Sequence, residues 1–281
     1  MNTLKLLNLG SDKLKQKQIV TYRLDSEILL SKVLKKKREE LLINLNQKIN
    51  PSQITKYNKF IIRRSNNEPI AYILKEKEFW SKNFYVSKDT LIPRPETELM
   101  VEKLVKIYKD KSISILDIGT GSGCILISLL SELRHSRGTG IDISKNAILI
   151  AKRNADRHGM YINLKFLNKS LSDNFNQKFD LIVSNPPYIM RKDIKNLNDD
   201  IKKYEPIIAL DGGNDGLDLI KKVIYKTREI LKINGMLALE VGNEQCKKVS
   251  KILIKNNFKI EHTIKDYKNN IRCLFSRFLK N

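Results

Sequence analysis

The stretch that decides the fold is Phe179-Asp180-Leu181-Ile182-Val183-Ser184-Asn185-Pro186-Pro187-Tyr188. Residues 181–183 are apolar and mostly branched, which predicts a short strand buried on both faces. Two prolines then end the strand, because proline lacks a backbone donor and has a fixed φ. We therefore expect a stiff loop at the carboxyl end of a buried strand, which is where open α/β sheets bind ligands.

This loop offers two hydrogen-bond acceptors beside an aromatic ring. The side-chain carbonyl of Asn185 and the backbone carbonyl of Pro186 lie close together, Pro187 stiffens the loop, and Tyr188 adds a flat face. Such a set suits a planar NH₂ group, either of an amide or of a nucleobase. A Pro-Pro turn in which Asn185 caps its own backbone explains the tetrapeptide equally well, so other motifs must decide.

A glycine-rich loop stands upstream. Residues 112–118 predict a strand, Gly119-Thr120-Gly121-Ser122-Gly123 follow, and residues 125–133 predict a helix. Glycines permit a tight turn and let the backbone approach a ligand closely. The pattern Gly-x-Gly-x-Gly is weak by itself, since a dinucleotide site uses similar spacing.

An acidic residue stands at the end of the next predicted strand. That strand covers residues 138–143, and Asp142 lies 23 positions after Gly119. A carboxylate at this place can accept hydrogen bonds from two vicinal ribose hydroxyls. The structural alternative is that Asp142 caps a helix that begins before Ser144.

Strands and helices alternate through the rest of the chain, and this alternation predicts a doubly wound α/β sheet. A helix that begins at Leu217 is expected to end at Asn234-Gly235, a typical C-cap pair. The other expected elements are a third strand at 162–167, a strand at 236–241, a helix at 244–256 and an antiparallel pair of strands at 258–264 and 271–278.

Residues 1–75 show helical spacing and no catalytic constellation. Asn50-Pro51 predicts a helix start, because a capping residue precedes a proline at the first helical position. A small helical bundle fits either a docking module or a stabilising cap. Aromatic runs at 78–80 and 84–86 around a polar turn then predict a β-hairpin.

The chain of 281 residues is basic, with 53 Lys and Arg against 31 Asp and Glu and a net charge of +22. Only 13 of the basic residues are Arg, and the basic residues are not concentrated in any one segment. A nucleic-acid site more often concentrates Arg, so compositional drift explains the charge better than such a site does. Cys124, Cys246 and Cys273 fit no zinc spacing, so we expect reduced thiols and no metal. The first ten residues are too polar for a signal peptide, and no apolar run reaches the roughly 18 residues of a membrane span, so we expect a cytoplasmic protein.

The segment Pro93-Arg94-Pro95-Glu96-Thr97-Glu98 leads into a predicted helix. Proline and acidic residues are favoured in a first helical turn, so a helix start alone can explain the composition of this segment. Its combination with Glu-Pro-Ile-Ala-Tyr-Ile at 68–73 and with Asn-Pro-Pro-Tyr is far more specific. These motifs resemble those of the bacterial release factor glutamine methyltransferase family. The resemblance extends over nearly the whole chain.

The resemblance implies a class I methyltransferase fold: an α/β, doubly wound, mostly parallel seven-stranded sheet with a small N-terminal helical bundle. It implies a helical substrate-docking domain at 1–75, a β-hairpin linker at 76–92 and an S-adenosylmethionine-dependent methyltransferase domain at 93–281. We expect a monomer that needs neither a membrane nor nucleic acid, although the charge is compatible with weak nonspecific contact to nucleic acid.

The resemblance also implies the reaction and its residues. The cofactor is S-adenosyl-L-methionine, and the acceptor is the side-chain amide nitrogen of the Gln in the Gly-Gly-Gln motif of class 1 peptide chain release factors. The expected catalytic residues are Asn185, Pro186 and Tyr188, and the expected substrate-binding residues are Asn185, Pro186, Pro187 and Tyr188. The expected cofactor-binding residues are Gly119, Thr120, Gly121, Ser122, Gly123, Asp142, Leu171 and Asn185.

The chain departs from the family pattern after the third predicted strand, where the usual acidic residue is missing or displaced in Asn168-Lys169-Ser170-Leu171-Ser172-Asp173. Alignment with the family pattern then implies that Leu171 lies against the adenine. Two other functions fit parts of the sequence. One is an amino N-methyltransferase of nucleic acid, of the adenine type, because adenine also presents a planar NH₂ group. The other is a non-catalytic RNA-binding protein with a methyltransferase fold, which the intact glycine loop, Asp142 and Asn-Pro-Pro-Tyr argue against.

Overall fold

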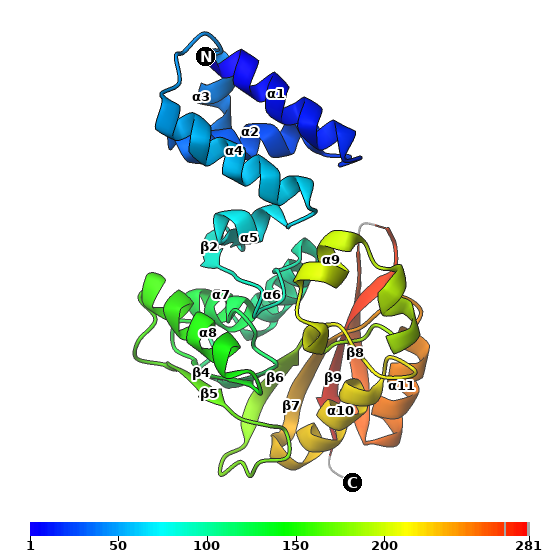
Figure 1. Cartoon of the computed structure of the whole chain (residues 1–281). Coiled ribbons are helices and arrows are strands. Elements are labelled where there is room, and N and C mark those ends of the chain that lie inside the picture. The colour runs from blue at the N-terminus through cyan, green and yellow to red at the C-terminus, as the bar shows by residue number, and fades with distance from the viewer. Residues whose placement is uncertain (267, 280–281) are drawn as a thin grey trace. The chain divides into compact units, whose positions relative to one another are not determined.

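The structure is a computed structural model that describes residues 1–266 and 268–279. The described chain divides into two compact units. The first unit comprises Met1–Glu76 together with Asn198–Tyr204, and the second comprises the remaining described residues. Figure 1 labels most of the helices and strands.

The N-terminal unit is a bundle of helices around an apolar core that includes Leu29, Tyr57 and Ile61. Helix α4 begins as predicted, because the Asn50 side chain accepts a hydrogen bond from the backbone N–H of Gln53 and Pro51 is the first helical residue. The short helix α9 belongs to this unit although it lies far along the chain. The helices are α1 (Thr3–Gln16), α2 (Tyr22–Leu34), α3 (Arg38–Ile43), α4 (Pro51–Ser65), α5 (Ile70–Leu74) and α9 (Asp199–Tyr204).

The predicted hairpin is present as β1 (Glu76–Phe79) and β2 (Lys82–Tyr85). Trp80 and Ser81 connect the two strands with φ values of 52° and 53°, as in the two-residue turns that match the twist of a hairpin. Phe79 and Phe84 are fully buried in the core of the second unit. The aromatic runs seen in the sequence thus anchor the hairpin to that core.

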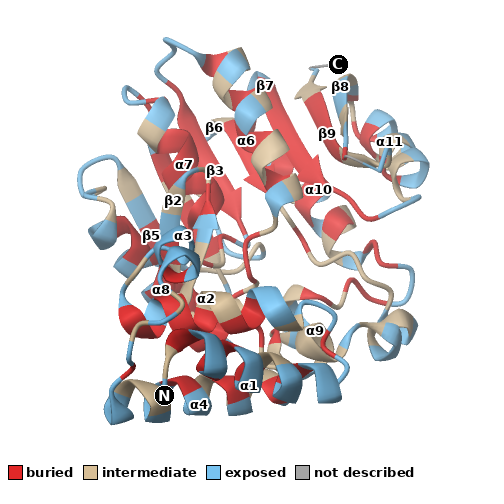
Figure 2. Ribbon diagram, turned by 90° about the horizontal axis from the view of Figure 1, so that it is seen from above, coloured by how far each residue is buried: buried red, intermediate tan, exposed pale blue. Residues whose placement is uncertain are grey.

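The second unit is built on a seven-stranded sheet with the strand order β5-β4-β3-β6-β7-β9-β8. The first five strands pair in parallel, and both pairs made by β9 are antiparallel. The expected doubly wound, mostly parallel sheet is therefore confirmed, and Figure 2 shows its central strands as buried. The strands are β3 (Ser114–Ile118), β4 (Arg137–Asp142), β5 (Leu164–Asn168), β6 (Phe179–Ser184), β7 (Leu231–Glu240), β8 (Phe258–Lys265) and β9 (Ile271–Phe278).

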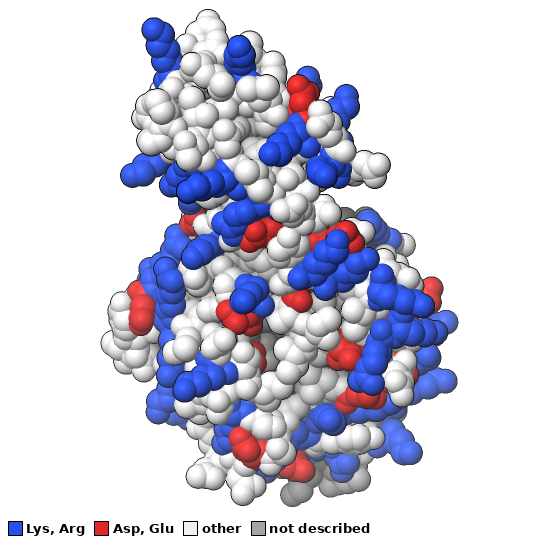
Figure 3. Space-filling view, in the orientation of Figure 1, with Lys and Arg blue, Asp and Glu red and all other residues white. Residues whose placement is uncertain are grey.

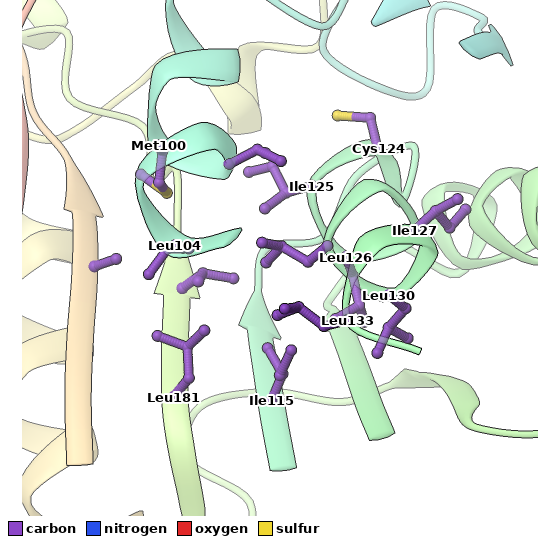
Figure 4. Close-up of a cluster of buried hydrophobic side chains, with 14 of the residues drawn as sticks. Met100, Leu104, Ile115, Cys124, Ile125, Leu126, Ile127, Leu130, Leu133 and Leu181 are labelled. Atoms are coloured by element: carbon purple, nitrogen blue, oxygen red, sulfur yellow. The ribbon is translucent and has the colours of Figure 1, made fainter. Parts of the chain in front are cut away.

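Helices cover both faces of this sheet. Successive strand residues alternate between the faces, so Ile115 and Leu181 join one core cluster while Leu116 and Ile182 join the other. Figure 4 shows the first cluster, where side chains of α6 and α7 meet those of β3 and β6. This face carries α6 (Pro95–Tyr108), α7 (Cys124–Glu132) and α8 (Lys145–Arg157); the other carries α10 (Asp218–Ile230) and α11 (Cys246–Lys255), and the β6–α10 loop holds 3₁₀ turns at Arg191–Asn196 and Ile207–Ala209.

The prediction that Asn234-Gly235 ends a helix is wrong. Helix α10 already ends at Ile230, and β7 begins at Leu231. The pairing of β7 with β6 shifts register between Phe179 and Leu181, and Asn234, with a φ of 62°, lies in the bulge that this shift creates. The third strand also begins two residues later than predicted, at Leu164, and Ile162 is exposed.

The register of the central strands brings the two key loops together. Ile118, the last residue of β3, pairs with Ser184, the last residue of β6. The strands are parallel, so the glycine loop after β3 and the Asn185 loop after β6 emerge side by side at the carboxyl end of the sheet.

Candidate active site

A pocket of about 670 Å³ opens at this carboxyl end, and its lining lies within the second unit. The predicted site residues that line it are Gly119, Thr120, Gly121, Ser122, Asp142, Leu171, Asn185, Pro186 and Pro187. The described lining does not include Gly123 or Tyr188. A single cavity therefore holds most of the residues that the sequence singled out.

The glycine loop forms one wall of the pocket. Gly119 and Gly121 have φ values of 72° and 55°, a region in which side chains are strained. A Cβ atom at Gly119 would meet no atom within 4 Å, because that side of the loop faces open space. Gly123 has a different role, since a Cβ there would come within 2.9 Å of the Phe166 ring. Two glycines thus leave room in the pocket, and the third allows close packing of α7 on the sheet.

Asp142 ties the end of β4 to the glycine loop. Its Oδ2 accepts a hydrogen bond from the backbone N–H of Gly121 at 3.0 Å, and its Oδ1 accepts one from Ser144 N–H at 2.9 Å. The N-cap of α8 is Ser144, whose side chain accepts from the N–H of Ala147, so capping that helix does not explain Asp142. Burial raises the pKa of the Asp142 carboxyl, and the backbone donors oppose that rise.

Asp117 is a buried carboxyl that the sequence analysis did not place in the site. Its Oδ2 accepts a hydrogen bond from the Thr120 hydroxyl at 2.7 Å, while its Oδ1 has no hydrogen-bond partner among the described residues. Burial raises the pKa of this carboxyl to about 7. An acidic residue at the end of an apolar strand, directly before a glycine loop, was the signal that could have found it.

We expect Asp117 to make the stability of the folded protein depend on pH. The pKa rises from 3.8 to about 7 on folding, so the folded state keeps this proton between those values while the unfolded state loses it. The free energy of unfolding should therefore fall, by on the order of a few kcal/mol, as the pH rises through this window. Urea titrations at several pH values should show a smaller fall for Asp117→Asn, which cannot titrate. Equal falls for both proteins would contradict this prediction.

The loop after β6 forms the opposite wall. Asn185 is half-buried, Pro186 is buried, and both line the pocket. The Asn185 Nδ2 donates a hydrogen bond to Oγ1 of Thr97 at 3.4 Å. Tyr188 turns its hydroxyl toward Oε1 of Glu240, at 3.5 Å, and burial raises the pKa of this tyrosine. The ring of Tyr188 packs against the core, so it supports the loop from behind and is not part of the described lining.

The Pro-Arg-Pro-Glu-Thr-Glu segment holds the site together through three polar side chains. Arg94 Nη2 donates to the buried carboxylate of Glu205 at 2.5 Å. The Thr97 hydroxyl donates to Glu240 Oε2 at 2.6 Å, and burial raises the pKa of that carboxyl. Glu98 Oε1 accepts a hydrogen bond from the backbone N–H of Trp80 in the hairpin turn at 3.0 Å. A helix start alone does not require these side chains, so the contacts of Arg94, Thr97 and Glu98 give the segment a further structural role.

The wall after β5 contains no acidic side chain in its described lining. Lys169, Ser170, Leu171 and Ser172 line the pocket there. The acid that follows them, Asp173, accepts a hydrogen bond from the backbone N–H of Ser170 at 2.9 Å and so closes the turn. The expected carboxylate is therefore displaced into the loop, and Leu171 offers an apolar face to the cavity.

Comparison with known proteins decides the family. The chain is 44% identical over 258 residues to the release factor glutamine methyltransferase of Buchnera aphidicola subsp. Schizaphis graminum, covering 91% of this chain and 92% of that protein. The chain belongs to the release factor glutamine methyltransferase family. The family profile described as PrmC N-terminal domain matches residues 5–74, and the profile described as methyltransferase small domain matches residues 93–203.

Two further comparisons give another related sequence and a structure with the same fold. The chain is 37% identical to a bifunctional methyltransferase of Rickettsia typhi, covering 96% of this chain but only 56% of that longer protein. A methyltransferase structure from Pyrococcus furiosus superposes with a TM-score of 0.53 at 18% identity, covering 70% of this chain and 89% of that one, and shows the same fold. A profile described as Eco57I restriction-modification methylase also matches residues 155–271.

Membership of a methyltransferase family identifies S-adenosylmethionine as the cofactor, and the pocket fits it. Gly119 and Gly121 leave open space for a ligand to approach the backbone. Asp142 lines the pocket and offers carboxylate oxygens to the hydroxyl groups of a ligand, while Asp117 is not part of the described lining and supports the glycine loop through Thr120. None of the helices in residues 1–266 and 268–279 is long and apolar enough to cross a membrane. Within the same residues, no cluster of three or more His, Cys, Asp and Glu side chains could hold a metal ion.

Proposed function

We propose that this protein transfers a methyl group to the side-chain amide nitrogen of the Gln in the Gly-Gly-Gln motif of class 1 peptide chain release factors. The observation that carries the proposal is the position of Asn185 and Pro186, which face the same pocket as the glycine loop. Membership of the release factor glutamine methyltransferase family supports this acceptor. The test is whether labelled methyl from the cofactor appears in a release factor and not in its variant that lacks the motif Gln.

The chemistry explains why an amide needs such a loop. S-adenosylmethionine, when bound, supplies an electrophilic methyl group on its sulfonium. An amide nitrogen is a poor nucleophile, because its lone pair is delocalised into the carbonyl. In our proposal Asn185 Oδ1 and the Pro186 carbonyl accept the two amide hydrogens and hold the nitrogen in one orientation. Catalysis then consists mostly of orientation and fixed dipoles.

We assign the cofactor contacts by the walls of the pocket. Asp142 would accept hydrogen bonds from ribose hydroxyls, because each of its oxygens keeps a free lone pair after its backbone contact. The backbone of Gly119-Thr120-Gly121-Ser122 would contact the polar part of the cofactor. Leu171 would contact the adenine, and Gly123 would act through packing.

We propose that the bundle, about residues 1–75, recognises the release factor and that residues 76–92 link it to the methyltransferase domain at 93–281. The pocket lining lies within the second unit, so cofactor binding does not use side chains of the bundle. Since release factors act in translation, we expect the protein in the cytoplasm, acting as a monomer.

Removing residues 1–75 should therefore separate the two binding events. We expect cofactor affinity to stay nearly unchanged and methylation of the release factor to fall severalfold or more. Calorimetry with S-adenosylmethionine, a methylation assay and a melting curve of the shortened protein measure this. Unchanged methylation of the release factor by the folded, shortened protein would contradict the docking role.

Methylation of a nucleobase amino group is the second candidate. The match to the Eco57I profile favours it, since the matched range of this chain, residues 155–271, includes the Asn-Pro-Pro-Tyr loop. The charge distribution gives it little support. Lys and Arg are scattered among Asp and Glu on the face shown in Figure 3, whereas a nucleic-acid site gathers basic residues in one stripe or patch.

A further inference from the structure

Two buried side chains are linked to Asn185 by hydrogen bonds: Thr97, which also lines the pocket, and Glu240, which is not part of the described lining. Glu240 is the last residue of β7 and is 2% exposed, and Thr97, in the first turn of α6, is also 2% exposed. Thr97 donates to Glu240 at 2.6 Å and accepts from Asn185 at 3.4 Å. The same Glu240 faces the hydroxyl of Tyr188, so one carboxyl contacts both ends of the Asn-Pro-Pro-Tyr loop, directly or through Thr97.

The direction of the hydrogen bonds that link Asn185, Thr97 and Glu240 follows from the donors available. While Glu240 is ionised its carboxylate only accepts hydrogen bonds, so the single proton of the Thr97 hydroxyl is used on Glu240. The Thr97 oxygen can then act only as an acceptor toward Asn185. The amide of Asn185 must present its NH₂ group to Thr97, which turns its carbonyl oxygen away from Thr97. Because Asn185 lines the pocket, we infer that this oxygen is open to the substrate.

This choice matters because the two ends of an asparagine amide have nearly the same shape and opposite hydrogen-bonding character. A substrate NH₂ group carries only donors. With the opposite orientation of Asn185, donor would face donor and the loop would repel the substrate. The contact of 3.4 Å is long, as catalytic hydrogen bonds often are before the substrate is bound.

We propose that Thr97 and Glu240 are positioning residues that fix the amide of Asn185 with its carbonyl oxygen toward the substrate. This inference rests on the proposed amide methylation and extends it to residues that act through Asn185. Neither residue needs to contact the cofactor for this role, so their effect should fall on the methyl-transfer step.

Three substitutions test the direction of these hydrogen bonds. Thr97→Val keeps the shape of the side chain and removes the hydroxyl, so we expect single-turnover methyl transfer to a release factor to slow about tenfold, the effect of one ordinary hydrogen bond. Thr97→Ser keeps the hydroxyl and should restore most of the rate. Glu240→Gln can donate to Thr97 and reverse these hydrogen bonds, so its loss should be at least as large. Cofactor affinity, measured by calorimetry, should change less than about twofold in all three.

Thr227→Val is a matched control. Thr227 is a fully buried threonine of α10 whose hydroxyl has no hydrogen-bond partner among the described residues. Removing this hydroxyl should leave the rate of methyl transfer unchanged. Melting curves of all variants show whether any loss of rate comes from unfolding.

A double-mutant cycle separates positioning from general support of the fold. If Thr97 acts through Asn185, Thr97→Val should cause no further loss in an Asn185→Ala background. A normal rate for folded Thr97→Val, or an equal loss in both backgrounds, would overturn this inference alone. A wild-type protein that methylates no release factor would overturn the proposed function and this inference with it.

Discussion

Replacement of Asn185 by alanine is expected to slow methyl transfer on the order of 10²–10³-fold, as loss of one preorganised catalytic hydrogen bond does. Asn185 follows directly after β6 and lines the pocket. In our proposal its side chain accepts a hydrogen bond from the substrate and is not a part of the core. Without it, the substrate NH₂ group can rotate away from the methyl donor. The fold should survive, because the strand residues before Asn185 keep their packing.

The measurement is single-turnover transfer to a release factor at saturating cofactor, with a melting curve. Asn185→Asp should be milder, because it keeps a carbonyl-type acceptor, although its charge must be desolvated. Asn163→Ala is a matched control, since Asn163 is exposed and lies directly before β5, at the opposite end of the sheet. A near wild-type rate for Asn185→Ala would mean that the Asn-Pro-Pro-Tyr loop is only a turn.

Replacement of Asp142 by alanine is expected to weaken S-adenosylmethionine binding about 10-fold to 100-fold. The substitution removes the proposed acceptor of two ribose hydroxyls and also the tether of the Gly121 N–H group. A hydrogen bond to a charged group is worth roughly 1.5–3 kcal/mol, part of which water replaces, and each 1.4 kcal/mol is about tenfold in affinity.

Calorimetry with S-adenosylmethionine measures this loss. Asp180→Ala is the matched control, because Asp180 is also a hydrogen-bonded carboxylate beside the parallel strands but contacts Ser114 and Lys232, outside the pocket. That variant should lose stability and keep its cofactor affinity. Unchanged affinity of Asp142→Ala would reject the ribose assignment.

The sequence was sufficient for the framework of the site because strands and loops follow local rules. A branched apolar run closed by two prolines, and a second strand closed by glycines, each predict a strand end. Parallel strands place such ends at one edge of the sheet, and the pairing of Ile118 with Ser184 does so here. The meeting of the glycine loop with Asn185 was therefore predictable.

The hydrogen bonds that connect the walls of the site to the rest of the fold were not predictable, because they join residues far apart in the chain. Thr97 meets Glu240 across 143 positions, and Arg94 meets Glu205 across 111 positions. Such contacts depend on where α6 packs and on the register of β7. A charged residue at the end of an apolar strand indicates a buried residue with a functional role, but the sequence does not say which side chain it contacts.

Local sequence signals gave wrong predictions where two kinds of local structure favour the same residues. Asn and Gly favour positive φ both in a helix cap and in a strand bulge. At Asn234 the pairing of β7 with β6 and β9 decides in favour of the bulge. The exposure of Ile162 is a similar case, since an apolar residue beside a strand need not belong to it.

The most direct test offers radiolabelled S-adenosylmethionine to the full chain with four acceptors: a class 1 release factor, the same factor with its Gly-Gly-Gln glutamine replaced by alanine, bulk RNA and bulk DNA. We predict label in the unmodified release factor alone, on the side-chain amide of that glutamine. Label in RNA or DNA, or equal label in the release factor and its glutamine variant, would contradict the proposed glutamine methylation.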